Sequence, residues 1–476
     1  MSSKSVSIDS KVRERIEQLG QHHVLQFWND LPEAEQTAFV EHLKSVDWKL
    51  AESLLEEFKD PQSASTGKLS TVAPPAHVVR KPKTESERAT WERAHELGEQ
   101  VLRDGKVAAI LLAGGQGTRL GFPHPKGMYP IGPVTEKSLF EILADQITAL
   151  VARYGRSIPY LIMTSDVTHD ETIRFFEQHS YFGIPRQDLF FFQQGYAPSL
   201  DSKTGELLLA DKSSLSLNPD GHGGMLAALL AAGLFQEMRQ RGVEYLFTHQ
   251  IDNPLVKACE PAFLGLHLMH EAEVSTKVVA KTSPQEKVGV AVDLDGRTAI
   301  IEYSDLPAEL ANETDAAGEL RYWAGSTAIH LFTLAFLEGV ATSAKSLPWH
   351  RAIKKIPHVD KTGQKIEPAT ENGLKFERFL FDSLPLAKTA LIVETIRDEE
   401  FAPLKNKTGE FSAEYVREHM VQVAKEWLKA VGIDVPAKAT IEISPRFAMS
   451  ARELAERKAD LKHLDFSKPL YLEPQK

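Results

Sequence analysis

The strongest constraint on the fold is an alternation of short apolar runs and helical patterns between residues 107 and 252. Four runs are apolar enough to be read as buried strands, at 107–114, 159–165, 188–192 and 245–252. Helical patterns fall between them, at 139–155 and 224–241. Strands that alternate with helices predict a mostly parallel sheet that is covered on both faces. Such sheets bind ligands at the carboxyl ends of their strands, so the motifs that follow these strands are the first candidates for a site.

Local signals place the ends of two helices. Thr84 and Glu87 have the spacing of a capping box, and Gly105 lies where a helix would end. Ser138 and Glu141 repeat the capping-box spacing before the helix that we expect to run to residue 155.

The N-terminal region has a different pattern. Apolar residues recur there at three- and four-residue spacing and predict helices up to about residue 60: Val24, Leu25, Phe27, Trp28, Leu31, Phe39, Val40 and Leu43. Residues 61–83 collect Pro, Ser and Thr without periodicity, which indicates a linker or an extended crossing strand. We therefore expect an N-terminal helical region with a linker at 1–100.

Beyond residue 252 the alternation loosens. Asp295-Gly296 between two β-rich runs predicts a hairpin, and 390–396 is the last clear strand. The tail holds an amphipathic helix at 413–431, a β-rich run at 438–444 and a charged helix near 451–461. We expect a central α/β domain at 101–405 and a small α+β domain at 406–476.

Charge and composition narrow the class of protein. A net charge of −11 argues against a nucleic-acid-binding protein, although a few cations in one cleft could still bind a phosphorylated substrate. The single cysteine, Cys259, excludes an intramolecular disulfide and a cysteine-rich zinc site. The N-terminus lacks the apolar stretch of a secretory signal, and the longest nearly uninterrupted apolar run, 223–235, is too short for a bilayer. We expect a cytoplasmic protein that binds neither membrane nor nucleic acid and is a monomer or a weak homo-oligomer.

The first strand runs into a glycine-rich turn, GGQGTRLG, which is followed by PKG. Gly114, Gly115 and Gly117 would let the backbone approach a ligand closely, with N–H groups directed outward as an anion nest. Arg119 and Lys126 follow on the same excursion and would supply positive charge to phosphate oxygens.

Other readings of this turn are less favourable. It is not a dinucleotide fingerprint, because the third glycine is displaced to Gly121, and it is not a Walker loop, because no Gly-Lys-Ser/Thr closes it. A tight strand-to-helix turn with two surface cations is the simplest alternative. The order of strand, Gly-Gly-x-Gly-Thr-Arg and Pro-Lys favours a phosphate site instead.

These residues resemble the signature of sugar-nucleotide pyrophosphorylases. Over roughly residues 85–450 the chain is similar to the UDP-N-acetylglucosamine/UDP-sugar pyrophosphorylase branch, with FFQQG, PDGHGG, DNPLVK, KTSPQEKVGV, IEYSD, KKIPHVD, NGLKFERFLFD and EEFAPLKN in order. The resemblance implies a Rossmann-like nucleotidyltransferase core at 101–405. It also implies a uridylyltransferase that forms a UDP-sugar and pyrophosphate from UTP and a sugar 1-phosphate, with Mg²⁺ or Mn²⁺ as the cofactor.

The same resemblance implies roles for individual residues. Catalysis would fall to Arg119, Lys126 and Lys405. The nucleotide would be bound by Leu112, Ala113, Gly114, Gly115, Lys126, Gln194, Gly221, Asp252 and Lys375. The sugar would contact His222, Gly289, Glu302, Tyr303, Ser326, Phe381 and Lys405. Asp252 would also hold the metal, since a carboxylate suits a hard divalent cation that takes phosphate oxygens.

Two positions depart from the N-acetylglucosamine branch and leave the sugar open. His222 stands where that branch usually has Asn, and Ser326 stands where the family commonly has a sugar-contacting Asn. We therefore expect N-acetylglucosamine 1-phosphate or a broader range of hexose 1-phosphates, with a uridylyltransferase for glucose or galactose 1-phosphate as the alternative.

Two further readings come from other classes of protein. A non-catalytic UDP-sugar-binding protein would have lost catalytic residues, yet Arg119, Lys126, Asp252, Lys375 and Lys405 are all retained. A Rossmann dehydrogenase is disfavoured by the register of the glycines.

Overall fold

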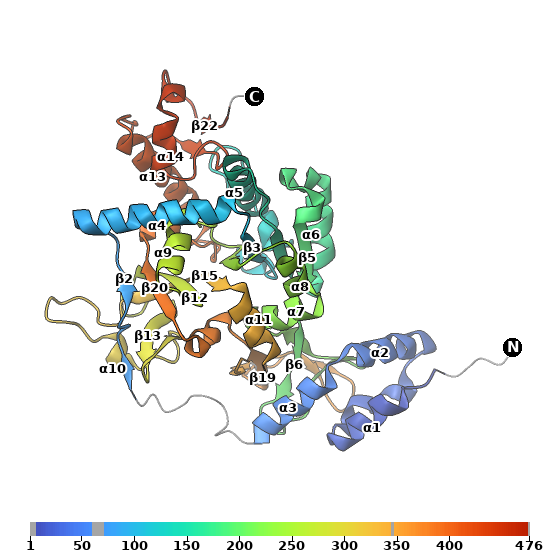
Figure 1. The fold of residues 1–476 in the computed structure, drawn as a ribbon. Coiled ribbons are helices and arrows are strands. Elements are labelled where there is room, and N and C mark those ends of the chain that lie inside the picture. Colours follow the sequence, from blue (N-terminus) through green and yellow to red (C-terminus); the bar gives the residue numbers. More distant parts are fainter. Residues whose placement is uncertain (1–5, 60–70, 344–346, 475–476) are drawn as a thin grey trace. The chain divides into compact units, whose positions relative to one another are not determined.

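The computed structural model describes residues 6–59, 71–343 and 347–474. It divides into two compact units (Figure 1), which we describe one at a time. The smaller unit comprises Met1–Leu69, Gln194–Met225 and Leu347–Leu380. The larger unit comprises Ser70–Gln193, Leu226–Ser346 and Phe381–Lys476.

A mixed, mostly parallel sheet forms the centre of the larger unit. Its main path runs in the order β2-β20-β12-β15-β11-β3-β4-β5. These strands are β2 (Val78–Val79), β3 (Val107–Leu112), β4 (Tyr160–Thr164), β5 (Leu189–Gln193), β11 (Tyr245–Gln250), β12 (Val274–Ala280), β15 (Ala324–Thr333) and β20 (Ala390–Glu394). Only β15 runs antiparallel to its neighbours β11 and β12. The other neighbouring pairs on this path are parallel.

A side sheet extends the larger unit beyond β15. It contains β1 (Val72–Ala73), β13 (Val290–Leu294) and β14 (Arg297–Ile301). Asp295 and Gly296 both have positive φ, at 53° and 79°, which is the backbone of a type I′ turn. The predicted hairpin is therefore confirmed.

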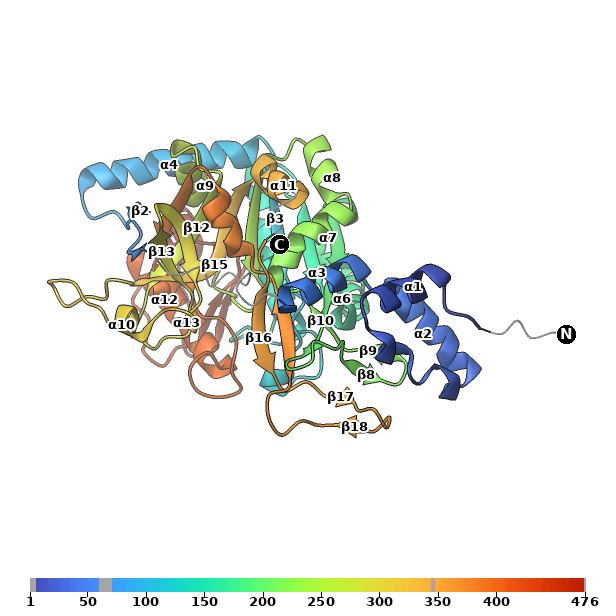
Figure 2. The same ribbon diagram turned by 90° about the horizontal axis from the view of Figure 1, so that it is seen from below.

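Helices cover the sheet of the larger unit. They are α4 (Glu85–Arg103), α5 (Leu139–Tyr154), α6 (Asp166–Gln178), α7 (Met225–Ala231), α8 (Leu234–Gln240), α9 (Pro261–Met269), α10 (Ala308–Ala311), α11 (Leu334–Thr342) and α12 (Arg397–Glu400). In both ribbon views α4 lies along α9 (Figures 1 and 2). Gly98 and Gly265 allow this close approach, because a Cβ at either position would overlap the backbone of the other helix or its first residue.

The C-terminal region adds α13 (Ala413–Ala430), β21 (Ile441–Ile443), α14 (Ala451–Glu456) and β22 (Leu470–Leu472). It has its own apolar cluster, which includes Leu428, Ile441 and Leu454. It is joined to α5 by an ion pair of 3.0 Å between Arg153 Nη2 and Glu456 Oε1.

The smaller unit combines helices and short strands from three separate stretches of chain. Its helices are α1 (Ser10–Gln18), α2 (Glu33–Ser45) and α3 (Trp48–Lys59). Its strands are β6 (Tyr196–Pro198), β7 (Leu200–Asp201), β8 (Leu209–Asp211), β9 (Ser214–Leu215), β10 (Leu217–Pro219), β16 (His350–Lys354), β17 (His358–Val359), β18 (Lys365–Ile366) and β19 (Gly373–Glu377). Phe39, Leu54, Leu200 and Phe376 share one buried cluster, so the three stretches form a common core.

The expected fold class, an α/β protein with a mostly parallel mixed sheet, a helical N-terminal region and a small α+β C-terminal region, is confirmed. The capping box predicted at Thr84 is confirmed, because Thr84 Oγ1 accepts a hydrogen bond from the Glu87 amide and Glu87 Oε2 accepts one from the Thr84 amide. Ser138 is the N-cap of α5 as predicted, since its Oγ accepts a hydrogen bond from the Glu141 amide, but the reciprocal bond from the Glu141 side chain that a capping box requires does not occur between these two described residues. The strands expected at 107–114, 159–165, 188–192, 245–252 and 390–396 are all present.

Two local predictions need correction. The helix expected over 224–241 is two helices, α7 and α8, because Gly233 adopts a left-handed conformation (φ 68°) that a regular α-helix cannot contain. The apolar residues around Val24 and Leu31 lie in short 3₁₀ turns, although several of them are buried as predicted.

The compact units do not follow the boundaries expected at residues 100 and 405. Helix α4 belongs to the larger unit, and so does the C-terminal region. Residues 194–225 and 347–380 belong with the N-terminal helices because their apolar side chains share that core. Residues 61–70 of the crossing segment expected at 61–83 lie outside the described residues, and the remainder contains the short strands β1 and β2.

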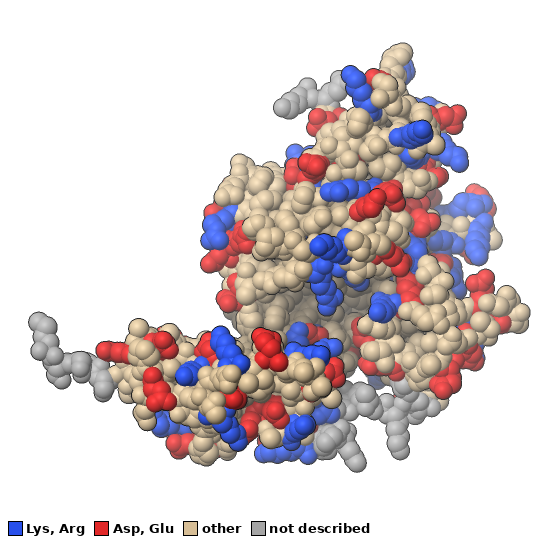
Figure 3. Space-filling view, turned by 180° about the vertical axis from the view of Figure 1, so that it is seen from behind, with Lys and Arg blue, Asp and Glu red and all other residues tan. Residues whose placement is uncertain are grey.

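Charged side chains of both signs are interspersed on the face drawn in Figure 3. Among the described residues, no helix combines the length and the apolar character that crossing a bilayer requires.

Candidate active site

The glycine-rich loop follows β3, which lies between β11 and β4 in the sheet. Two hydrogen bonds hold the start of this loop against the end of β4 and the residue that follows it. The Ala113 amide donates to the carbonyl of Met163 (2.8 Å), and the Gly114 carbonyl accepts from the hydroxyl of Ser165 (2.8 Å). Within the described part of the chain, the amides of Gly114, Gly115 and Gln116 donate no hydrogen bond. Three adjacent amides are therefore available to an acceptor on a ligand.

The loop folds back so that its two ends meet. The amide of Lys126 donates to the carbonyl of Gly115 (3.1 Å), and the amide of Gly117 donates to the carbonyl of His124 (3.0 Å). Gly117 has to be glycine here, because a Cβ would come within 2.8 Å of the carbonyl oxygen of Phe122. The turn thus holds Lys126 beside the open amides.

Lys126 reaches the carboxyl end of β11. Its Nζ lies 3.9 Å from Oδ2 of Asp252 and 3.4 Å from the carbonyl oxygen of Leu404. The amide of Leu404 in turn donates to the carbonyl of Asp252 at 2.7 Å. Lys405 follows directly and is exposed. The structure therefore brings Gly115, Lys126, Asp252 and the backbone at Lys405 together.

Arg119 lies in the same loop, in the short turn Thr118–Leu120, and is exposed. Gly121 ends that turn with φ 73°, and a Cβ there would lie 3.8 Å from Nζ of Lys407. Lys407 is a cation that the sequence analysis did not single out. Its position two residues after Lys405 was the available signal.

A second group of predicted residues meets beside β15. The amide of Ser326 donates to the carbonyl of Gly289 at 2.8 Å. A Cβ on Gly289 would lie 2.9 Å from Cγ2 of Ile300 and 3.6 Å from Oε1 of Glu302, so glycine leaves room beside that carboxylate. Tyr303 follows Glu302 and is 46% exposed. Gly289, Glu302 and Ser326 are thus neighbours, while Phe381 is buried at the start of the larger unit's last segment.

The smaller unit holds the remaining predicted residues. Gln194 is buried and precedes Gly195, whose carbonyl accepts from the amide of Asp220 at 3.1 Å. Gly221 has φ 83°, and a Cβ there would lie 2.5 Å from the carbonyl oxygen of Arg378. Gly221 is therefore glycine for both conformational and steric reasons.

His222 is fixed to the segment after β19. Its Nδ1 accepts from the amide of Leu380 (3.0 Å), and its ring lies 5.3 Å from that of Phe379. Burial lowers the pKa of His222 to about 4, against the opposing effect of Glu377. The ring is therefore neutral at pH 7, and its Nδ1 is the acceptor. Lys375 on β19 forms an ion pair of 2.7 Å with Glu377.

Asp220 was not predicted, although it lies inside the PDGHGG motif. Burial raises its pKa to about 6, and Arg378 opposes that rise. Its Oδ1 is buried and has no hydrogen-bond partner among the described residues. A Cβ on Gly195 or on Gly224 would press against this carboxylate, so both glycines are needed to enclose it.

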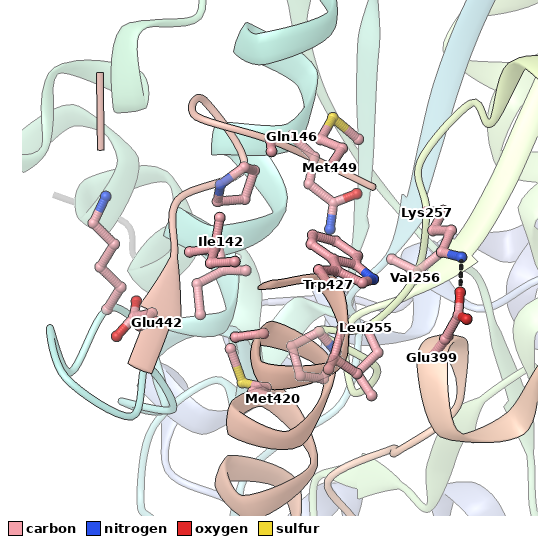
Figure 4. Close-up of a pocket in the computed structure, with 17 residues that line it drawn as sticks. Ile142, Gln146, Leu255, Val256, Lys257, Glu399, Met420, Trp427, Glu442 and Met449 are labelled. Atoms are coloured by element: carbon pink, nitrogen blue, oxygen red, sulfur yellow. Dashed lines mark hydrogen bonds and ion pairs between the residues drawn. The ribbon is translucent and has the colours of Figure 1, made fainter. Parts of the chain in front are cut away.

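The larger unit also has an apolar pocket beside the C-terminal region (Figure 4). Leu255, Val256, Met420, Trp427 and Met449 form much of its wall, and the Lys257–Glu399 ion pair lies at one side. No residue predicted for the site lines it, although its wall at 254–257 begins two residues after Asp252.

A family model described as UTP–glucose-1-phosphate uridylyltransferase matches residues 50–449, most of the chain. The chain belongs to this family. As a member of the UTP–glucose-1-phosphate uridylyltransferase family it is a nucleotidyltransferase, as expected.

Curated relatives of the family extend the likeness over most of the chain. UDP-N-acetylhexosamine pyrophosphorylase-like protein 1 of Xenopus tropicalis is 37% identical over 419 residues, which is 85% of this chain and 81% of the relative. UDP-N-acetylglucosamine diphosphorylase 2 of Arabidopsis thaliana is 34% identical and covers 93% of this chain and 90% of its own.

A solved structure agrees with both. The crystal structure of the uridine diphosphate N-acetylglucosamine pyrophosphorylase from Trypanosoma brucei superposes with a TM-score of 0.84 at 27% identity, covering 99% of each chain. The resemblance to the UDP-sugar pyrophosphorylases is therefore confirmed at the level of sequence and of fold.

Proposed function

We propose that this uridylyltransferase joins UTP to N-acetylglucosamine 1-phosphate, or to a broader range of hexose 1-phosphates, in the family's reaction. The observation that carries the proposal is the meeting of the open amides at Gly114–Gln116 with Lys126, Asp252 and the backbone at Lys405. The names of the Arabidopsis and Trypanosoma relatives support N-acetylglucosamine as the sugar.

In the proposed reaction an oxygen of the sugar 1-phosphate attacks the α-phosphorus of UTP. A new P–O bond forms, the bond to the β-phosphate breaks, and pyrophosphate leaves. Two polyanions must come together, so their mutual repulsion is the main barrier, and positioned cations supply most of the catalysis. Lys126 and Arg119 would stabilise the phosphates of UTP, and Lys405 would hold the phosphate of the sugar. No side chain needs to act as a nucleophile.

Asp252 fits the metal that the family resemblance implies. It is 8% exposed, it lies two residues after the end of β11, and its contact with Lys126 is a loose one of 3.9 Å. Mg²⁺ commonly takes one or two protein carboxylates and completes its shell with substrate phosphates and water, so one carboxylate suffices. Among the described residues no group of three or more His, Cys, Asp or Glu could hold a metal without a substrate. When bound, Mg²⁺ would neutralise charge on the phosphate oxygens.

Two residues favour a second sugar class. His222 presents a neutral ring, and Ser326 presents a short hydroxyl, where longer amides are usual in the N-acetylglucosamine branch. Fewer amide contacts would reduce discrimination for the N-acetyl group and favour glucose or galactose 1-phosphate.

The decisive experiment measures UTP-dependent pyrophosphate release with the 1-phosphates of glucose, galactose, N-acetylglucosamine and N-acetylgalactosamine. We expect the highest kcat/KM with N-acetylglucosamine 1-phosphate. Higher values with glucose or galactose 1-phosphate would select the second class. Binding of UDP-sugars without any turnover would instead identify a non-catalytic binding protein.

A further inference from the structure

Asn253 follows Asp252 in the chain and is 4% exposed. Both the nitrogen and the oxygen of its side-chain amide form hydrogen bonds. Its Nδ2 donates to the carbonyl of Glu400 at 2.7 Å, and its Oδ1 accepts from the amide of Ala402 at 3.2 Å. Together with the 2.7 Å bond from the Leu404 amide to the Asp252 carbonyl, three bonds tie residues 252–253 to the backbone of 400–404.

The segment that Asn253 holds is also fixed from its other side. Glu400 is fully buried, and its carboxylate accepts from Nζ of Lys277, from the hydroxyl of Thr395 and from the amide of Lys257 (3.4 Å). Lys277 also donates to Oε2 of Glu260 at 2.6 Å. The carboxylate is therefore held on three sides.

Glu260 is the carboxylate of this cluster whose pKa is lowered. Burial raises the pKa of Glu260, but Lys277, Lys257 and Lys81 outweigh it and bring the pKa to about 2. A buried ion pair adds little net stability compared with apolar residues of the same volume, but each charge must keep its partner. The arrangement therefore restricts where the backbone at residue 400 can lie.

The restricted segment at residues 400–402 continues directly to Leu404 and Lys405 in the candidate active site. Leu404, whose carbonyl lies 3.4 Å from Nζ of Lys126, is only two residues past the end of the Asn253 bridge. The Lys405 side chain projects from the next position. A displacement of about 1 Å at a catalytic group is enough to reduce turnover by roughly a hundredfold.

We infer that Asn253 is a positioning residue for the proposed transfer, because its amide bridge sets the backbone that presents Leu404 and Lys405 to Lys126 and Asp252. The inference rests on the proposed function. A purely structural role would lower stability without a specific loss of kcat.

The test compares Asn253→Ala with Gln21→Ala by steady-state kinetics and thermal unfolding. Gln21 is a matched control, since it is an equally buried amide in the smaller unit whose Oε1 accepts from the amide of Leu207 at 2.8 Å. We expect Asn253→Ala to lower kcat by about 10- to 100-fold, the range typical of residues that orient a site, with both KM values within about threefold of wild type. Gln21→Ala should lose similar thermal stability and keep its kcat.

A second variant covers the case in which Asn253→Ala does not fold. Thr395→Val keeps the shape of the side chain and removes only the hydroxyl that donates to Glu400. It should lower kcat several-fold, in the same direction and again without a large change in KM.

The outcomes separate the two proposals. If the wild-type protein releases no pyrophosphate from UTP with any of the four sugar 1-phosphates, the proposed function fails. If the wild type turns over and Asn253→Ala, or Thr395→Val in its place, matches it in kcat, only the positioning role fails. Equal losses of kcat in Asn253→Ala and Gln21→Ala would also overturn it, because the loss would then follow stability.

Discussion

At the scale of single residues, Lys126 connects more of the candidate site than any other predicted side chain. Its amide binds the glycine-rich loop, and its ammonium group lies between Asp252 and the carbonyl of Leu404. Lys126→Ala should lower kcat by about 10²- to 10³-fold, the usual cost of removing one charge-stabilising donor. Pyrophosphate release measures this. Lys44→Ala, which removes an exposed lysine paired with Glu41, is the control that should leave turnover unchanged.

Asp220 gives a prediction about pH. Burial raises its pKa from 3.8 to about 6, so the folded protein binds this proton more tightly than the unfolded chain does. Stability from this group is therefore complete below pH 3.8 and is lost as the pH rises through 6. The ionised carboxylate then costs at most about 3 kcal/mol, at roughly 1.4 kcal/mol per pKa unit.

Asp220→Asn should remove that cost. We expect the melting temperature to rise at pH 8 and to change less at pH 5, as measured by thermal unfolding in matched buffers. An equal change at both pH values would show that the pKa of Asp220 is not raised in the folded protein.

The sequence could predict site residues that follow strands, but it could not predict the buried polar residues that support the site. Lys126 and Asp252 lie in the loops that follow β3 and β11, so the strand pattern together with the family resemblance could place them at one edge of a parallel sheet. Asp220 and Asn253 matter because of what they contact. A buried carboxylate or amide has no sequence signature of its own, since its partners at Arg378 or Glu400 lie more than a hundred residues away.

At the scale of elements, the glycine-rich loop offers a matched pair of substitutions. A Cβ on Gly115 would meet nothing within 4 Å, whereas a Cβ on Gly117 would overlap Phe122. Gly115→Ala should therefore keep the thermal stability of the wild type. If UTP lies against this backbone, its KM for UTP should rise about tenfold, equivalent to roughly 1.4 kcal/mol.

Gly117→Ala should behave in the opposite way. The forced overlap should cost about 1–3 kcal/mol of stability before any substrate is added. Thermal unfolding separates the two variants. An unchanged KM in Gly115→Ala would place UTP away from the loop.

Elements were predictable where a local signal decided them. The Ser138 cap, the Gly155 stop and the Asp295-Gly296 turn all act through neighbouring residues. The prediction over 224–241 failed because periodicity alone did not show that Gly233 adopts positive φ and splits the helix. A glycine in a helical pattern does not by itself end the helix. The backbone conformation that the glycine adopts in the folded protein decides whether the helix continues.

At the scale of the whole molecule, the core of the smaller unit connects the N-terminal helices to the candidate nucleotide residues. Phe39 is fully buried and shares a cluster with Leu374 and Phe376 on β19, the strand that carries Lys375. Phe39→Ala should cost about 3–5 kcal/mol and lower the melting temperature. The KM for UTP should rise if Lys375 contacts the nucleotide. Val167→Ala, at a position 61% exposed in the larger unit, is the control that should change neither quantity.

The sequence led to boundaries at residues 100 and 405, because the alternation of strands and helices begins after the first and the last clear strand ends before the second. Compact units instead follow which apolar faces pack together, and the smaller unit takes up three stretches that are far apart in the chain. No local sequence pattern predicts that three such distant stretches pack into one core. The reaction class was predictable because many short motifs occur in a fixed order, which does not depend on how the units are divided.

The three-part smaller unit has a consequence for biosynthesis. The N-terminal helices leave the ribosome before the other two stretches of the smaller unit, and Leu374 and Phe376, which share their apolar cluster, are translated more than three hundred residues later. Until then those faces have only part of their core, and partly buried apolar surface promotes aggregation. A nascent chain stalled before residue 347 should therefore be bound by chaperones far more than one released after residue 380.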